Sequence, residues 1–460
     1  MMRSPISFFS LILLLISCSK TEPIDIDTPQ GITDPPPEIT APPSDTCECD
    51  HLYSDVSSGF IVIDGEKDAI KAGDRICIKS GTYNRISVKN LTGNEQEQIV
   101  LSNCDGPVNI KITSSTGHGM TIVNSQYFKV LGTLSNGVYG FQFSGENYNN
   151  TALAINNKIS DFEIAYMHIE NVELAMHIMN RPGCTSSSQY PDWEVKNIYI
   201  HDTSIKNIGN EGMYIGYSNY PKAVDFECDG VAVSAYCPLI KNIHVFNNTI
   251  ENCGWDGMQL SYAPEGAKIY SNVIKNTGTK NNPNQRAGIV VGGGTKGDVF
   301  NNYVTKVLGD GIDVFGIGDV NIYNNIIVDT DHGIFIGDRK LYKSDANFKV
   351  LNNTIIKANG NGVRMNHRTS LANEFSNNII VSTLQNPIYY VNKNTSGNTI
   401  EKTNLKVENS SAILFLDDTY NLTKESPAVN AGTNLTEFKT DFYGKNRDGQ
   451  FDIGAIEYQF

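Results

Sequence analysis

Six short segments between about residues 198 and 380 share a pair of polar residues, usually Asn-Asn, inside an apolar frame. They are Phe246–Ile250, Tyr270–Ile274, Phe300–Val304, Tyr323–Ile327, Leu351–Ile355 and Ser376–Ile380. The second residue of each pair follows the previous one after 23 to 30 residues. A repeat of this length with strand-like segments is typical of a β-solenoid, in which each coil buries its apolar face only by stacking on the next. The sequence therefore predicts an all-β chain of stacked coils.

Each coil also carries a glycine followed by three residues, of which the first and third are apolar. The copies are Gly212–Ile215, Gly257–Leu260, Gly288–Val291, Gly311–Val314, Gly333–Ile336 and Gly362–Met365. Strand alternation places the first and third residues inside and the second outside. We expect the second residues to form one continuous outward ladder: Tyr214, Gln259, Val290, Asp313, Phe335 and Arg364.

The recurring asparagines and glycines have structural explanations. Asparagine tolerates the left-handed backbone of a tight bend between strands. Stacked asparagines can also hydrogen-bond one another along the solenoid axis. Glycine permits either a positive φ or a close approach of backbones. We therefore expect these residues to build the fold rather than to carry chemistry.

The repeat resembles the right-handed parallel β-helix of the pectate-lyase-like superfamily over roughly residues 59 to 390. The first coil, Ala72–Tyr83, is similar to the opening of such lyases, and Ser426–Pro427–Ala428 with Asp452–Glu457 resembles a C-terminal cap of secreted bacterial β-helix proteins. The resemblance implies a solenoid with three sheets and coils of about 22–31 residues. A cap is expected because a solenoid end exposes unpaired strand edges.

The N-terminus resembles that of a bacterial lipoprotein. Arg3 precedes a short apolar run, and Leu15–Cys18 is similar to a lipobox. The run is too short for a permanent membrane span. We expect a signal peptide over residues 1–17, a lipidated Cys18 with a proline-rich tether over 18–45, a β-helix over 46–425 and the cap over 426–460. This predicts an exported outer-membrane lipoprotein, exposed at the cell surface; an ordinary secretory signal is the alternative.

The charge balance restricts the partners of the chain. The net charge is −14 and the isoelectric point about 5.1. A nucleic-acid-binding protein would need a basic face, and the sequence shows none. An anionic glycan would need a local cation, either Arg, Lys or a metal. We expect a polysaccharide ligand, a monomer, and membrane contact only through the lipid.

The chain has nine cysteines. Lipidation of Cys18 leaves an even number, which is consistent with disulfides in an exported protein. Cys228 and Cys237 lie in one long insertion, and we predict that they pair. Cys77 and Cys104 are about one coil apart and could stack.

Aligning the coils on the glycine gathers polar and aromatic side chains on one sheet, along which the resemblance places the substrate groove. Glycans stack on aromatic rings and hydrogen-bond to polar groups. We assign substrate binding to His177, Glu211, Tyr214, Tyr217, Trp255, Gln259, Tyr262, Arg286 and His367. The candidate catalytic residues are Asp310, Asp313, His332, Arg364 and Arg339. Turn chemistry explains Asp-Gly equally well, and any single charge could simply be solvated.

Two mechanisms fit this group. In a lyase, a base removes the proton beside a uronate carboxylate that calcium or arginine neutralises. Asp256, Asp310 and Asp313 could hold Ca²⁺. In a hydrolase, two carboxyl groups flank the glycosidic bond. The competing hypothesis is a non-catalytic glycan-binding or adhesive β-helix, because fold alone does not fix function.

Overall fold

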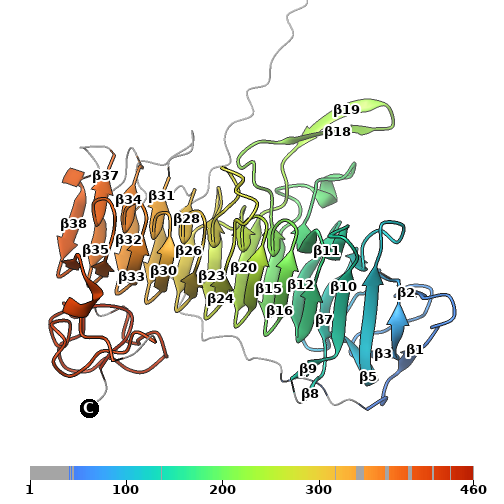
Figure 1. Ribbon diagram of the computed structural model, residues 1–460. Coiled ribbons are helices and arrows are strands. Elements are labelled where there is room, and N and C mark those ends of the chain that lie inside the picture. Colours follow the sequence, from blue (N-terminus) through green and yellow to red (C-terminus); the bar gives the residue numbers. More distant parts are fainter. Residues whose placement is uncertain are drawn as a thin grey trace, which may run out of the picture.

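The computed structural model shows an elongated stack of parallel β-coils (Figure 1). It describes residues 41, 43, 46–135, 137–315, 318–337, 347–367, 372–391, 396–416, 419–435 and 437–458. The predicted signal peptide, Cys18 and Arg339 lie outside these residues. No helix in the described ranges is long and apolar enough to cross a membrane.

One wall of the solenoid is a twelve-stranded parallel sheet. Its strands, in spatial order, are β2 (Phe60–Asp64), β4 (Arg85–Lys89), β6 (Met120–Val123), β11 (Thr151–Asn156), β14 (Leu174–Met179), β17 (Met213–Ile215), β22 (Met258–Leu260), β25 (Ile289–Val291), β28 (Ile312–Val314), β31 (Ile334–Ile336), β34 (Val363–Met365) and β37 (Ile388–Tyr390). Six of them, β17 to β34, are the predicted post-glycine strands.

The other two walls form a single twenty-three-stranded sheet, because β5 (Ile99–Ile112) is long enough to pair in both. The first wall also contains β1 (His51–Tyr53), β3 (Arg75–Tyr83), β7 (Gln126–Leu131), β12 (Ser160–Ala165), β15 (Val195–His201), β20 (Ile240–Phe246), β23 (Glu265–Tyr270), β26 (Gly297–Phe300), β29 (Val320–Tyr323), β32 (Phe348–Leu351), β35 (Asn373–Ser376) and β38 (Thr399–Lys402). The second contains β10 (Phe141–Gly145), β13 (Met167–Glu170), β16 (Ser204–Ile208), β21 (Thr249–Cys253), β24 (Val273–Lys275), β27 (Tyr303–Thr305), β30 (Ile326–Thr330), β33 (Thr354–Ala358), β36 (Ile379–Val381) and β39 (Leu405–Val407). The predicted three-walled parallel solenoid is confirmed.

Asparagines line the corner between these two walls. The first residue of each pair has a positive φ, as in Asn301 with 55° and Asn324 with 54°. The second is buried: Nδ2 of Asn302 donates to Oδ1 of Asn325 at 3.0 Å, and Nδ2 of Asn325 donates to Oδ1 of Asn353 at 3.0 Å. This ladder extends from Asn248 to Asn404. Both predicted roles of asparagine are therefore confirmed, each by a different member of the pair.

The repeated glycines sit where two coils approach closely. A Cβ on Gly288 would lie 2.7 Å from the carbonyl oxygen of Gly311, and a Cβ on Gly311 would lie 2.6 Å from that of Gly333. Contacts this short exclude any side chain. Close approach, rather than a positive φ, is the reason for glycine at these positions.

The insertion after β17 forms the antiparallel hairpin of β18 (Val224–Cys228) and β19 (Val231–Ala235), which projects from the solenoid (Figure 1). Cys228 lies at its tip and pairs with Cys184, whereas Cys237 follows its base and is a buried free thiol. The predicted Cys228–Cys237 disulfide is wrong because a hairpin strand of this length keeps the two sulfurs more than about 10 Å apart. A smaller hairpin joins β8 (Leu134–Ser135) and β9 (Val138–Tyr139).

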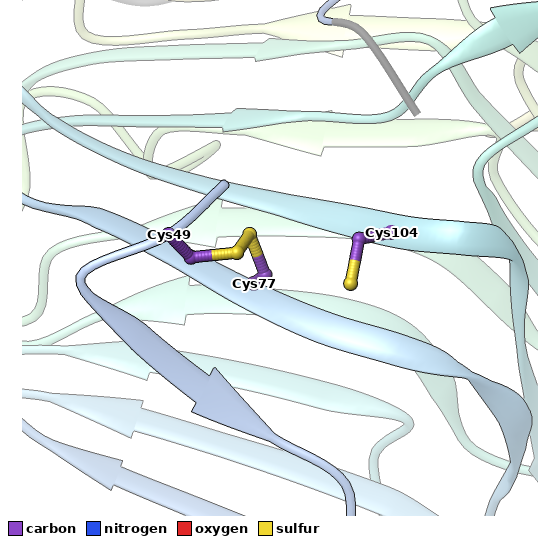
Figure 2. A group of neighbouring side chains, drawn as sticks. All are labelled: Cys49, Cys77 and Cys104. Atoms are coloured by element: carbon purple, nitrogen blue, oxygen red, sulfur yellow. A yellow bond between two sulfur atoms is a disulfide. The ribbon is translucent and has the colours of Figure 1, made fainter. Parts of the chain in front are cut away.

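Two disulfides fasten the start of the described chain to the first coils. Cys47 pairs with Cys104, and Cys49 pairs with Cys77. Figure 2 shows the Cys49–Cys77 bond beside Cys104, and the sulfurs of these three residues lie within 4.8 Å of one another. The expected proximity of Cys77 and Cys104 is therefore present, although each pairs with the segment before β1.

The C-terminal segment lies along the side of the last coils. Ile413, Leu422, Ala428, Ile453 and Ile456 pack on outward apolar residues of β30, β33 and β36. The buried Arg447 pairs with Glu457 at 2.8 Å and donates to Oδ1 of Asn324 at 3.0 Å. We expected a cap over the end of the solenoid, but Ile400 on the last coil is still 48% exposed. The C-terminal segment instead covers the apolar outer face of β30, β33 and β36 on the side of the solenoid.

Candidate functional site

The predicted ladder is present in register on the twelve-stranded sheet, but it is not outward along its whole length, because Gln259, Val290 and Asp313 are buried. Paired residues follow one another from strand to strand: His177, Tyr214, Gln259, Val290, Asp313, Phe335 and Arg364. Asp313 and Arg364 thus lie on the same face, two strands apart, or about 9.6 Å. Side chains distant in the sequence become neighbours here because the coils stack in register.

The residues before the glycines form a second, deeper column. Asp256 Oδ1 accepts from the main-chain nitrogen of Ala287 at 2.7 Å, and Asp310 Oδ1 accepts from that of His332 at 3.2 Å. Each acid therefore binds the backbone of the following coil and not that of its own turn. This contact fixes the side-chain position and makes the acidic column part of the scaffold as well as of the site.

Burial changes the protonation of the acids in this column. Burial and the neighbouring Glu173 raise the pKa of Glu211 to about 7. Burial, Glu211 and Asp310 raise the pKa of Asp256 to about 7. Burial and Asp331 raise the pKa of Asp310 to about 6, although Arg286 and Arg364 oppose that shift. Asp310 is the least buried of the three acids and is largely ionised near neutral pH.

His332 has a fixed tautomer. The main-chain N–H of Asn361 donates to its Nδ1 at 2.8 Å. A neutral imidazole has one donor and one acceptor nitrogen, and both nitrogens face a donor here. The main-chain N–H of Asn361 cannot turn away, whereas the long side chain of Arg364 can, so we assign the hydrogen to Nε2. Burial lowers the pKa of His332, and Arg364 and Arg286 add to this effect while Asp331 opposes it. The neutral ring therefore presents an N–H towards Arg364.

Arg364 faces that N–H. Its Nη1 lies 3.0 Å from Nε2 of His332, and its guanidinium lies 5.5 Å from the ring centre of Phe335. Within the described residues, its Nε is buried without a hydrogen-bond partner. Two donors this close together can both reach one acceptor oxygen placed beside them. We call His332, Phe335 and Arg364 the anion site.

We call the outward face of the twelve-stranded sheet the strip, and a loop of residues 277–286 crosses part of it. Nε2 of Gln285 donates to Oε1 of Glu211 at 3.0 Å, and Nη2 of Arg286 pairs with Asp331 at 3.2 Å. Glu211 is only 3% exposed as a result. Its carboxyl is therefore covered by the loop, and the expected role of Glu211 in substrate binding is not supported. Asp331 was missed from the sequence, although it directly precedes His332.

Several predicted substrate residues are not at the surface. Tyr262 is fully buried and donates its hydroxyl to the carbonyl of Lys222 at 3.2 Å. His367 is also fully buried, with its ring 4.9 Å from that of Phe348. These two predictions are wrong because both side chains turn into packed interiors. Tyr217 and Trp255 are half-buried at the edge of the strip and stay predictions.

The predicted calcium ligands do not converge. Asp256 and Asp310 are separated by the coil of Ala287, and each uses one oxygen to bind backbone. Among the described residues, the one group of three or more His, Cys, Asp or Glu ligand atoms within 4.8 Å of each other is Cys49, Cys77 and Cys104. The three aspartates therefore do not form a common ion site.

Comparisons with known proteins agree with the fold. The family model "Right handed beta helix region" matches residues 240–405. The GH136 lacto-N-biosidase from Eubacterium ramulus is 11% identical, with a TM-score of 0.52 over 76% of this chain and 68% of that one. A pectate lyase is 13% identical, with a TM-score of 0.47 over 88% and 99%. No curated protein matches the sequence significantly. At such identities the likeness is one of fold.

Proposed function

We propose that the protein is a surface-anchored, carbohydrate-active protein that binds an acidic polysaccharide along its twelve-stranded sheet and cleaves it by elimination. The observation that carries the proposal is the anion site, where the Nε2–H of His332 faces the guanidinium of Arg364 at 3.0 Å. A uronate carboxylate between them would accept from both. Hydrogen bonds between ions and N–H groups of this kind are among the strongest in proteins.

The anion site also fits the chemistry of elimination. A carboxylate that is neutralised by Arg364 and His332 makes the hydrogen on the adjacent carbon more acidic. Phe335 supplies an apolar surface beside it, suited to the face of a sugar ring. His332 acts as a donor rather than as a base, because its only acceptor nitrogen is occupied by Asn361.

Asp310 is the proposed base. Its pKa of about 6 keeps it largely ionised near neutral pH, yet high enough to accept a proton in the reaction. Asp310 takes the proton, a carbon–carbon double bond forms, and the bond to the glycosidic oxygen breaks. The departing oxygen then takes a proton from solvent or from the site.

Hydrolysis is the second candidate reaction. Asp310 and Asp313 lie on one coil, and the raised pKa of Asp310 would suit a general acid. Asp313 is 8% exposed on the outward ladder, beside Phe335. In hydrolysis, Asp310 and Asp313 would act on the glycosidic bond itself. This reaction needs neither the removal of a proton from carbon nor a neutralised substrate carboxylate.

The test is incubation of the purified protein with polygalacturonate, alginate and a neutral glycan. Elimination produces ultraviolet absorbance from the new double bond, whereas hydrolysis produces reducing ends alone. We expect absorbance on a uronate polymer and its loss in Arg364→Ala. Retention of a polymer without either product would support the non-catalytic binder, and failure to retain any acidic polymer would refute the proposal.

A further inference from the structure

A pocket of about 350 Å³ lies on the first wall, away from the twelve-stranded sheet. It is formed over β7, β12 and β15, which are neighbours in the stack (Figure 1). Sequence reasoning missed it, because its residues come from coils before the Asn-Asn repeat begins. We call it the tyrosine pocket, and its charged and tyrosine side chains are Glu95, Tyr127, Lys129, Asp161, Glu163 and Tyr199.

Tyr127 interrupts a column of polar residues. The following coils have Asp161, Asn197 and Asn242 at this position, with φ values of 53°, 51° and 54°. Nδ2 of Asn242 donates to Oδ1 of Asn197 at 2.8 Å, and Nδ2 of Asn197 donates to Oδ1 of Asp161 at 2.6 Å. Tyr127 has the same backbone, with a φ of 52°, although this conformation favours asparagine over an aromatic residue. The fold alone therefore does not explain a tyrosine here.

The column ends at a carboxylate with one oxygen unused. Among the described residues, the one hydrogen bond to the carboxylate of Asp161 is that from Asn197 to Oδ1. Asp161 is only 9% exposed and lines the tyrosine pocket, so its Oδ2 is open to that pocket and to little else. A largely buried carboxylate oxygen without a donor is costly. It indicates a ligand that brings a hydrogen-bond donor into the pocket.

The second acid of the pocket floor, Glu163, is held by a buried network. Its Oε2 pairs with Nζ of Lys129 at 2.8 Å, and its Oε1 lies 3.0 Å from Nε2 of His201. Nδ1 of His201 in turn lies 2.6 Å from Oδ2 of Asp202. Glu163 is 5% exposed and His201 1%. The network fixes the floor of the pocket and uses the ammonium group of Lys129 for the protein's own carboxylate.

These features favour a neutral ligand that carries hydroxyl groups. The carboxylates of Glu95, Asp161 and Glu163 line the pocket against the single, paired ammonium group, so an anionic sugar would be repelled. A sugar hydroxyl, in contrast, donates well to a carboxylate oxygen. The half-buried Tyr127 and Tyr199 offer rings to the apolar face of a sugar. The volume also falls within the range of about 300–1,000 Å³ that is usual for small-molecule sites.

We propose that the tyrosine pocket is a second, non-catalytic glycan-binding site, and that it takes a residue of a neutral glycan. The hydroxyl groups of that residue donate to Asp161, and its ring lies against Tyr127 and Tyr199. The pocket is on a different wall from the anion site, so the protein can hold a neutral and an acidic chain at the same time. The proposal does not depend on the reaction at Asp310.

The test measures binding of neutral pentasaccharides of glucose, xylose, mannose and galactose by calorimetric titration, beside trigalacturonate and a glucosamine pentamer. The main variant is Tyr127→Asn, which places the residue type of the later coils at this position. Asp161→Asn is the second variant, and it keeps an Oδ1 that can accept from Asn197. The control is Tyr148→Asn, because Tyr148 also has a positive φ, 55°, and is half-exposed, but lies outside the pocket.

We expect at least one neutral pentasaccharide to bind the wild type and Tyr148→Asn equally, and both Tyr127→Asn and Asp161→Asn about tenfold more weakly. Tyr127→Asn should unfold at the same or a higher urea concentration than the wild type, because asparagine suits the backbone better. A purely structural role for Tyr127 predicts the opposite, a less stable variant with unchanged binding.

Three results would overturn the proposal. The first is that no neutral pentasaccharide binds the wild type, or that Tyr127→Asn and Asp161→Asn bind it as the wild type does. The second is that the glucosamine pentamer alone binds, because the pocket would then select a cation. The third is that trigalacturonate binding is lost in Tyr127→Asn, because the pocket would then hold the acidic sugar that its carboxylates should repel.

Discussion

The asparagine corner and the outward strip of the twelve-stranded sheet are built on the same coils but differ in regularity. At the corner, every coil from Asn248 to Asn378 repeats one residue type and one set of hydrogen bonds. On the strip, the corresponding positions change from coil to coil: Glu211, Asp256, Ala287, Asp310, His332 and Asn361. Backbone stacking requires the repeated asparagine at the corner. It does not depend on which residue stands at the corresponding position of the strip.

This difference separates architecture from chemistry. A buried asparagine of the ladder hydrogen-bonds to several neighbouring groups. Replacing it with another residue leaves buried donors or acceptors without partners. The residues of the strip need only bind the next coil through one atom, so their other atoms can carry a function. The site is therefore found where the repeat is broken while the coil geometry is kept.

The largest expected effect is on the strip alone. Asp310→Asn removes the base but keeps an Oδ1 that accepts from the main chain of His332. We expect activity on the identified polymer to fall by about 10²- to 10⁴-fold with little change in stability. Asp298→Asn, on the other sheet, is the matched control because Asp298 is also an acid whose pKa burial raises. Equal activity in Asp310→Asn and the wild type would exclude Asp310 as the base.

The next effect is on the corner alone. Asn325→Ala removes the acceptor for Asn302 and leaves the carbonyl of Val299 without its donor, all in buried surroundings. We expect the free energy of unfolding to fall by about 3 kcal/mol. Asn321→Ala is the control on the same coil, where the side chain bonds only to Asp298. Denaturant unfolding measures both, and equal losses in the two variants would contradict a special role for the ladder.

A smaller effect is expected on the pH dependence of stability, through two buried acids of the strip. Glu211 and Asp256 have folded pKa values of about 7, above their ordinary values of 4.5 and 3.8. Their protonated forms therefore stabilise the fold, fully so below the ordinary values, and this contribution is lost as the pH rises through about 7. We expect Glu211→Gln/Asp256→Asn to flatten the fall in urea midpoint with rising pH. An unchanged pH profile in this variant would show that the two acids are ionised throughout.

The smallest effect concerns neither region. Cys18→Ser should abolish labelling with radioactive fatty acid and release the protein from membranes. The unfolding transition of the β-coil domain should stay unchanged, because residue 18 precedes the first strand, which begins at His51. Continued labelling of Cys18→Ser would contradict the lipoprotein prediction.

The sequence predicted the corner and the ladder because both follow from simple periodicity. The Asn-Asn pairs identify the bend, and the alternation after each glycine identifies the outward residues, so Asp313, Phe335 and Arg364 fell on one face as expected. Once the length of the repeat is known, the position of a residue along its coil can be read directly from the sequence.

Orientation and pairing could not be read in this way. Tyr262 and His367 follow strands, as Tyr217 does, yet both are fully buried. Tyr262 packs under the insertion after β17, and His367 packs against Phe348. The Cys228–Cys184 disulfide depends on the direction of a hairpin that only the fold reveals. The tautomer of His332 depends on the main-chain N–H of Asn361, a residue 29 positions away.

The most direct test of the central claim is a nitrogen-15 NMR measurement of His332 during titration with an oligouronate. His332→Gln identifies its signals among the eight histidines. The account predicts a neutral ring with its hydrogen on Nε2, and a shift of that N–H resonance when the ligand binds. A hydrogen on Nδ1, or an Nε2–H signal that stays unchanged while the oligouronate binds, would contradict it.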